Sequence, residues 1–307
     1  MTESSSPKIT AVIPAFNEEN TIGRIVEETR KYVTEVVVVD DGSTDTTRNV
    51  ALSAGATVLT HSINMGYGDA LATGFEYVKN NGANIMVILD GDGQHDPADI
   101  ARLAAPIISG QADIVLGSRF ISNGSKKDIP AYRRFGLGIV NKAWNMSSTS
   151  ENVTDTQCGF RAYSRNAIDK IDIQEAGMSA SLEILDQAGK SNLRLMEVPV
   201  KVGYEGDTST YKPSRHGMEL VNYVLKKLRE EHPLLIFGGV GLVTSSIGLV
   251  FGIIAINGYF DSRYLPFGPT IVAGILIYVG TLMIFGGLIL NSIQSIAAKL
   301  EDKRLRK

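Results

Sequence analysis

Short apolar runs alternate with amphipathic segments over most of the chain. The runs are rich in valine and isoleucine and end at polar or glycine-bearing turns, which is typical of strands buried on both faces of a sheet. The predicted strands cover residues 8–15, 35–41, 57–60, 85–89, 113–117 and 194–202. The predicted helices cover residues 20–32, 43–54, 69–79, 97–108 and 178–190. This alternation predicts an α/β domain over residues 8–214 with a doubly wound, mostly parallel sheet.

The pattern changes near the C-terminal end, where two long segments carry no charged residue. They cover residues 234–256 and 265–290, and each exceeds the ~20 residues needed to cross the hydrocarbon core of a bilayer. Two helices buried in a soluble core are the alternative, but such helices normally keep a polar face. The connector over residues 257–264 is short. We therefore expect a two-helix transmembrane hairpin over residues 233–291.

Basic segments lie on both outer sides of the predicted hairpin. Residues 215–232 combine apolar positions at helical spacing with lysine and arginine, which predicts an amphipathic helix at a membrane surface. Residues 292–307 form a basic tail, whereas the connector holds only Arg263, offset by Asp261. The positive-inside rule then places the tail and the α/β domain in the cytoplasm, beneath a cell membrane crossed twice. Residues 1–7 are polar, which predicts a disordered lead-in. They lack the apolar stretch of a signal peptide.

Overall composition excludes some classes of partner. The net charge of −3 does not favour a nucleic-acid binder. The single cysteine, Cys158, excludes an internal disulfide and fits a reducing compartment. Basic residues concentrate within residues 118–165. The apolar spans also contain glycines that could pack on each other or on a second chain, which makes a homo-oligomer possible: Gly238, Gly239, Gly241, Gly286 and Gly287.

An acidic cluster follows the fourth predicted strand. Asp90, Asp92 and Gln94 occupy alternate positions, so in an extended chain their side chains converge and suit a hard cation such as Mg²⁺ or Mn²⁺. An EF-hand loop is excluded because His95 and Ala101 stand where it needs glycine and glutamate. Helix-capping aspartates without a ligand are the other alternative. A cation is favoured because two neighbouring carboxylates repel each other unless an ion or a proton intervenes.

Polar residues also follow the first two predicted strands. Pro14, Phe16 and Glu18 follow the first strand, and Asp40 and Asp41 end the second. A dinucleotide-binding fold would place a glycine-rich phosphate loop after the first strand, and that loop is missing. Acidic strand ends suit the hydroxyls of a ribose or the N–H of a base, and the carboxyl edge of such a sheet is where ligands bind.

Four motifs together carry a family resemblance. IPAFNEENTI, VVDDGSTDTT, NMGYGDAL and ILDGDGQHDP, in this order, resemble the family 2 glycosyltransferases. DGDGQH together with DTQCGFRAYSR is similar to the dolichyl-phosphate mannose synthase group, and the match covers residues 8–225. The resemblance implies a GT-A fold, a nucleotide-sugar donor, Mg²⁺ or Mn²⁺, and inversion at the anomeric carbon. It also implies a C-terminal membrane segment.

The resemblance assigns roles to residues according to what they would contact. The nucleotide-sugar site would be lined by Pro14, Phe16, Glu18, Val39, Asp41, Asp90, Gly91 and Asp92. The metal ligands would be Asp90, Asp92 and Gln94. The acceptor phosphate would meet Arg133, Arg134 and Arg161. The implied catalytic residues are Asp92, Asp155 and Arg119, of which Arg119 would meet the donor phosphates. Glu183 would brace the site.

The expected reaction moves a hexose or N-acetylhexosamine onto dolichyl or another polyprenyl phosphate, for protein or cell-surface glycosylation. A phosphate monoester has a second pKa near ~6, so it is largely anionic at neutral pH and needs no strong base. The donor nucleotide stays open between GDP and UDP, because Gly203 and Thr210 replace the basic residues common in the family's last loop. Two alternatives remain, a membrane transferase acting on a sugar hydroxyl of a lipid-linked glycan and a non-catalytic scaffold that binds nucleotide sugars. A processive synthase lacks support because Trp144, the only tryptophan, is not in a Q-x-x-R-W motif.

Overall fold

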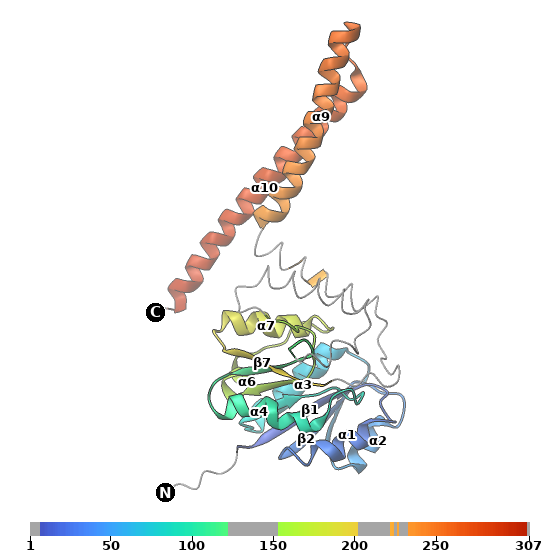
Figure 1. Cartoon of the computed structure of the whole chain (residues 1–307), viewed down its shortest axis with the longest axis vertical. Coiled ribbons are helices and arrows are strands. Elements are labelled where there is room, and N and C mark those ends of the chain that lie inside the picture. The colour runs from blue at the N-terminus through green and yellow to red at the C-terminus, as the bar shows by residue number, and fades with distance from the viewer. Residues whose placement is uncertain (1–6, 122–152, 202–221, 224–225, 227–232, 306–307) are drawn as a thin grey trace. The chain divides into compact units, whose positions relative to one another are not determined.

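The computed structural model describes most of the chain (Figure 1). The described residues are 7–121, 153–201, 222–223, 226 and 233–305. Contacts divide the chain into one unit up to Tyr223 and a second from Val224, and each is treated separately below. Most of the lead-in and of the amphipathic segment lies outside the described residues, as do Arg133 and Arg134. The predictions made for them stay predictions.

The first unit is built on a mixed sheet. Among the described residues it has seven strands in the order β3-β2-β1-β4-β6-β5-β7. The strands are β1 (Ile9–Ala15), β2 (Glu35–Asp40), β3 (Thr57–Thr60), β4 (Ile85–Ile88), β5 (Ile114–Ser118), β6 (Arg161–Ser164) and β7 (Leu195–Pro199). Strand β6 is antiparallel to β4 and β5, and the other pairs are parallel. The expected mostly parallel sheet is confirmed, but β6 was missed because its four residues, RAYS, show no apolar run.

Helices cover both faces of this sheet. They are α1 (Ile22–Thr29), α2 (Thr47–Ser53), α3 (Tyr67–Asn80), α4 (Ile100–Ile108), α6 (Arg165–Lys170) and α7 (Ala180–Lys190), with a short 3₁₀ turn, η1 (Pro97–Asp99), before α4. Ile25 of α1 and Leu103 of α4 share one core with Ile13 and Val87 on one face of the sheet. On the other face α3 packs so closely that a Cβ added at Gly74 would meet the side chain of Val12. Alternate residues of each central strand are therefore buried on opposite faces, which explains the continuous apolar runs.

An ion pair fastens the starts of β5 and β7. The carboxylate of Asp113 accepts hydrogen bonds from the backbone N–H (3.0 Å) and Nε (2.9 Å) of Arg194. It also accepts one from the side chain of Asn166, at the start of α6. The hydrogen bonds from Arg194 lower the pKa of Asp113 from 3.8 to about 2. The pair thus joins three elements that are far apart along the chain.

We expect Asp113→Asn to destabilise the folded chain by about 1 kcal/mol at pH 7, a modest value because Arg194 is largely solvated. A carboxylate with a lowered folded pKa contributes stability above its unfolded pKa and loses it as the pH falls through the folded value. The gap between wild type and variant should therefore narrow as the pH falls from 3.8 toward about 2. Thermal unfolding of both proteins in detergent, followed by circular dichroism across this range, measures the gap. A gap that stays constant with pH would contradict the assignment.

The second unit contains the expected pair of apolar helices. A π-helical turn, η3 (Leu234–Gly238), leads into α9 (Gly239–Ser262), and α10 (Phe267–Leu305) follows. Within the described residues, the segments Leu234–Ser262 and Phe267–Ile296 are long and apolar enough to cross a membrane. Helix α10 also runs on through most of the basic tail. Arg263 ends α9 in a left-handed conformation with φ of 63°.

Small residues line the contact between α9 and α10. The buried positions recur every seven residues: Gly241, Gly248 and Ala255 on α9, and Ala273, Gly280 and Gly287 on α10. A Cβ added at Gly241 would lie 2.5 Å from the carbonyl oxygen of Gly280, so the two backbones touch. A seven-residue repeat favours a left-handed crossing, and small residues allow close approach of helices in lipid. These glycines thus pack within one hairpin, and a homo-oligomer through the outward faces stays a prediction.

Candidate active site

The carboxyl ends of β1, β2 and β4 bring the predicted donor residues to one edge of the sheet. These three strands are parallel neighbours, so the segments that follow them meet. The Thr21 hydroxyl lies within hydrogen-bond distance of two acceptors, the carbonyl of Gly91 (2.7 Å) and the Glu18 carboxylate (3.1 Å). A Cβ added at Gly91 would lie 3.2 Å from the carbonyl oxygen of Pro14. Pro14, Glu18 and Gly91 therefore lie together as expected, and the partly exposed Phe16 follows directly after β1.

Two of the predicted donor residues are placed differently. Val39 pairs with Pro14 inside the sheet and has an exposed fraction of 0 %, so it presents no atom to a base. Asp41 is also buried, and its carboxylate accepts hydrogen bonds from the backbone N–H of Met65 (2.9 Å) and Gly66 (2.8 Å) and contacts His61 Nδ1 (2.7 Å). Asp41 thus organises the loop after β3, and the contact with base or ribose expected for it stays a prediction. The local sequence did not indicate these contacts, because the hydrogen-bond partners of Asp41 lie 20 to 25 positions further along the chain.

The two aspartates after β4 have opposite electrostatic environments. Burial raises the pKa of Asp90, but the hydrogen bond from His95 Nε2 (3.2 Å) and the positive charges of Arg161 and Arg119 outweigh it, so the pKa is lowered. Burial raises the pKa of Asp92, and the negative charge of Asp90 raises it further, although Asp92 accepts a bond from the Gln94 N–H (2.9 Å). The surroundings of Asp90 therefore favour its anionic form, whereas those of Asp92 disfavour ionisation.

Glu18 belongs to the same group of carboxylates. Burial raises its pKa to about 7, and the charges of Asp92, Asp45 and Asp90 act in the same direction against a hydrogen bond from Thr21. The charge of Asp90 thus disfavours the ionisation of Asp92 and of Glu18, and a cation bound between these carboxylates would stabilise their anionic forms.

The donor set fits Mg²⁺ or Mn²⁺ if a substrate completes the coordination shell. Within the part of the chain that the structure describes, no three histidine, cysteine, aspartate or glutamate side chains converge closely enough to hold an ion alone. These ions commonly take one or two carboxylates and the oxygens of a bound phosphate. Asp90 and Asp92, with Gln94 beside them, therefore suit a metal that binds together with a diphosphate.

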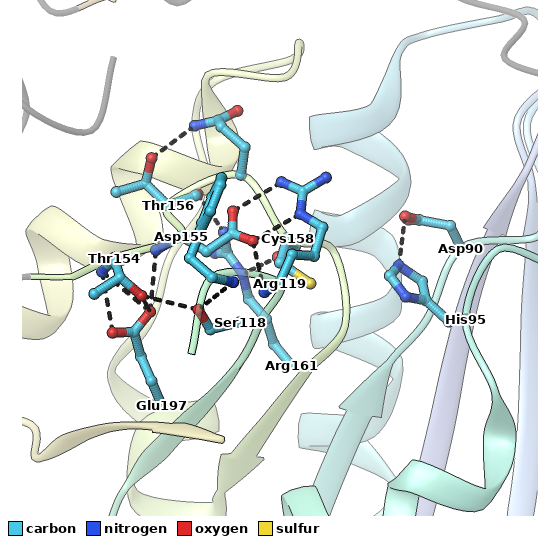
Figure 2. A network of polar contacts seen from close by, with 12 residues as sticks. Asp90, His95, Ser118, Arg119, Thr154, Asp155, Thr156, Cys158, Arg161 and Glu197 are labelled. Atoms are coloured by element: carbon cyan, nitrogen blue, oxygen red, sulfur yellow. Dashed lines mark hydrogen bonds and ion pairs between the residues drawn. The ribbon is translucent and has the colours of Figure 1, made fainter. Parts of the chain in front are cut away.

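Arg119 and Asp155 form a buried ion pair beside this cluster (Figure 2). Arg119 donates from Nε (2.7 Å) and from one guanidinium nitrogen (2.8 Å) to the two oxygens of Asp155, and its backbone N–H donates as well (3.1 Å). Asp155 has an exposed fraction of 0 %. Both oxygens of this carboxylate are therefore engaged by the guanidinium of Arg119. The structure thus places Asp155 as the partner of Arg119, and the catalytic role expected for Asp155 stays a prediction.

Arg161 is also placed differently from the prediction. It lies at the start of β6, is 2 % exposed, and donates to the backbone carbonyls of Cys158 (2.8 Å), Ser181 (3.1 Å) and Thr156 (2.7 Å). These bonds join the guanidinium to the segment before β6 and to α7, and the contact with the acceptor phosphate expected for Arg161 stays a prediction. Its charge still acts on Asp90 from inside the protein.

Three contributors to the site were missed from the sequence. His95 is buried, contacts Asp90, and lies with its ring 5.0 Å from that of Phe160. A Cβ added at Gly159 would lie 2.6 Å from one oxygen of Asp90 and 2.7 Å from the other. Tyr67 lies close enough to Asp90 for that charge to add to the effect of burial, which raises the tyrosine pKa. The only signal in the sequence was that all three lie within the quoted motifs.

Glu183 braces the site through a loop. Its carboxylate accepts the backbone N–H groups of Gln174 and Glu175. The carbonyl of the next residue, Ala176, accepts a hydrogen bond from the N–H of Gly68 (2.7 Å) at the start of α3. A side chain at Gly68, the second residue of α3, would clash with the backbone of Glu175 and Ala176 in this loop, which explains the glycine at this position.

Comparison with known proteins identifies the family to which this fold and acidic edge belong. Residues 10–172 match glycosyl transferase family 2, which is more than half of the chain. The chain belongs to this family and is a glycosyltransferase.

Individual relatives refine the comparison. A UDP-N-acetylglucosamine–dolichyl-phosphate N-acetylglucosaminyltransferase of Methanococcus voltae is 31% identical over 214 residues, which is 63% of this chain and 84% of the relative. A polyprenol monophosphomannose synthase of Mycolicibacterium smegmatis is 28% identical over 200 residues, which is 62% of this chain and 75% of the relative. Glucosyl-3-phosphoglycerate synthase from Mycobacterium tuberculosis, solved with Mn²⁺ and UDP-glucose, has a TM-score of 0.55 at 21% identity, over 72% of this chain and 79% of that chain. This last likeness supports the GT-A type of fold.

Proposed function

We propose that the chain transfers a hexose or N-acetylhexosamine from a GDP- or UDP-linked sugar to dolichyl or another polyprenyl phosphate, with inversion. The observation that carries the proposal is the grouping of Asp90 and Asp92, which suit a metal ion, at the edge of the sheet beside an Arg119 held by Asp155. Such a site suits a diphosphate leaving group. Relatives whose names include dolichyl phosphate or polyprenol support the acceptor class.

The donor would lie with its diphosphate at the edge formed by Glu18, Gly91 and Asp92. A metal held by Asp90, Asp92 and Gln94 would neutralise negative charge on the leaving diphosphate. Arg119, kept in place by Asp155, would add a fixed positive charge on the same group.

The acceptor supplies its own nucleophile. An oxygen of the polyprenyl phosphate forms a bond to the anomeric carbon while the bond from that carbon to the diphosphate oxygen breaks, and the electron pair leaves with the diphosphate. No proton moves, because the phosphate is already largely anionic at neutral pH. A buried, ion-paired Asp155 agrees with a reaction that needs no general base.

The membrane part of the proposal rests on the hairpin of α9 and α10. Two spans would keep the enzyme in the bilayer where a polyprenyl phosphate is found. The basic flanks of the hairpin favour a cytoplasmic catalytic domain, by the positive-inside rule.

The test uses membranes that contain the full chain, labelled GDP-mannose, UDP-glucose or UDP-N-acetylglucosamine, and either dolichyl phosphate or dolichol. We expect labelled lipid with one donor and only with the phosphate, because the alcohol lacks an anionic nucleophile. Membranes without the chain are the control. No labelled lipid with any of the three donors would contradict the proposal, and labelling of a glycan hydroxyl instead would favour the alternative transferase.

A further inference from the structure

A carboxylate on the neighbouring strand organises the loop that carries Asp155. Glu197 of β7 accepts hydrogen bonds from the backbone N–H groups of Thr154 (3.0 Å) and Asp155 (3.0 Å) and from the Thr154 hydroxyl (2.8 Å). Figure 2 draws these contacts beside the pair of Arg119 and Asp155. The loop lies outside any helix or strand, so side-chain contacts hold it.

The register of the sheet explains why this carboxylate reaches the loop. Strand β7 is parallel to β5, and Glu197 pairs with Leu116. Partner residues of neighbouring strands point to the same face, and so does the residue two positions further on. Ser118 therefore shares the face of Glu197 and directly precedes Arg119.

A directional chain of hydrogen bonds ends at Glu197. The Thr154 hydroxyl has one proton and gives it to the carboxylate, so the contact of 2.8 Å between the hydroxyls of Thr154 and Ser118 must use the proton of Ser118. The Ser118 oxygen in turn accepts the N–H of Phe120 (3.3 Å). Aligned hydrogen bonds strengthen one another, and an anionic acceptor at the end makes each donor stronger. Both residues that flank Arg119 are thus tied to the strand beside it.

We propose that Glu197 is a positioning residue for glycosyl transfer, acting on Arg119 through the loop of Thr154 and Asp155. With the loop fixed, Asp155 meets the guanidinium with both oxygens and aims it in one direction. Without Glu197, the backbone N–H groups of the loop lose an ionic acceptor and the pair shifts. This inference rests on the proposed contact between Arg119 and the donor diphosphate.

The test is a double-mutant cycle on the full chain in membranes, with Glu197→Gln, Arg119→Ala and both together. We expect Glu197→Gln to lower kcat by about 10- to 100-fold with little change in the acceptor KM, because a small displacement of a charged group costs about that much. In the Arg119→Ala background the same substitution should cost less than about 2-fold, because residues that act through one another are not additive. Glu27→Gln, an exposed glutamate on α1, is the control for loss of charge and should leave kcat unchanged.

The affinity of UDP or GDP with Mn²⁺, measured by calorimetry, provides a second cycle that needs no turnover. A failure to form labelled lipid would contradict only the proposed reaction. The binding measurement would still test the role of Glu197. Equal fold-losses for Glu197→Gln with and without Arg119 would indicate a general structural role and would overturn the inference. If Glu197→Gln does not fold, Thr154→Val removes the hydroxyl link alone and should show the same dependence on Arg119 with a smaller loss. An additive loss for Thr154→Val would likewise overturn it.

Discussion

Asp92→Asn is expected to abolish glycosyl transfer while the protein keeps its stability. The change removes one of the carboxylates that suit the metal, and with it several kcal/mol of charge stabilisation on the leaving diphosphate, or about 10³-fold or more in kcat. The folded chain gains from the same change, because burial and the charge of Asp90 raise the pKa of Asp92 and so disfavour its anion. The melting temperature in the absence of metal should therefore stay constant or rise.

The matched control for this prediction is Asp96→Asn, four residues further along the chain. Asp96 is exposed and caps η1 by accepting the N–H of Ala98, a role that asparagine can keep. Labelled-lipid formation and thermal unfolding are measured on both variants, and wild type is assayed with excess EDTA. Full activity in Asp92→Asn, or wild-type activity that survives EDTA, would reject the metal role of this carboxylate.

Gly159→Ala should have the second large effect, because the added methyl group would meet both oxygens of Asp90 at 2.6 and 2.7 Å. Asp90 can relieve this contact only by moving its carboxylate, which would break the hydrogen bond with His95. We expect kcat to fall by about 10²-fold as the carboxylate is displaced from its productive geometry. Overpacking of this kind should also cost about 1–3 kcal/mol of stability.

Two further variants separate displacement of Asp90 from a general effect of alanine. Gly239→Ala at the start of α9 places its methyl group in open space and should change neither transfer nor stability. Combining Gly159→Ala with Asp90→Ala removes the opposing carboxylate, so stability should recover, whereas the residual activity should be lost together with the Asp90 carboxylate. Normal activity in Gly159→Ala, or no recovery of the melting temperature in the double variant, would contradict this account.

The elements with a strong local pattern were predictable. The central strands β1, β2 and β4 appeared as apolar runs because both faces of each strand are covered by helices. The hairpin was equally visible because each candidate span contains a long stretch without a charged residue and has a high mean hydropathy. Strand β6 was not, because its place between β4 and β5 is decided by pairing across the sheet and its own residues include a buried arginine.

In the candidate site, too, some placements followed from local sequence and others did not. The neighbourhood of Asp90, Asp92 and Glu18 followed from acidic residues at strand ends and from the common direction of parallel strands. The roles of Asp41 and Arg161 did not follow, because their partners lie elsewhere in the chain. Asp41 is 20 positions from His61, and Arg161 is 20 positions from the carbonyl of Ser181.

By itself the sequence determined a mostly parallel α/β domain, a gathering of acidic residues at one edge of its sheet, and a pair of apolar spans. Periodicity and strand ends are local properties, so residue order alone carries them. Only the tertiary structure decided that Asp155 forms an ion pair with Arg119, 36 positions away, and that Glu197 binds the backbone of Asp155 from 42 positions away. A buried charged side chain must be paired or hydrogen-bonded, and the groups that do this come from parts of the chain that only the folded structure brings together.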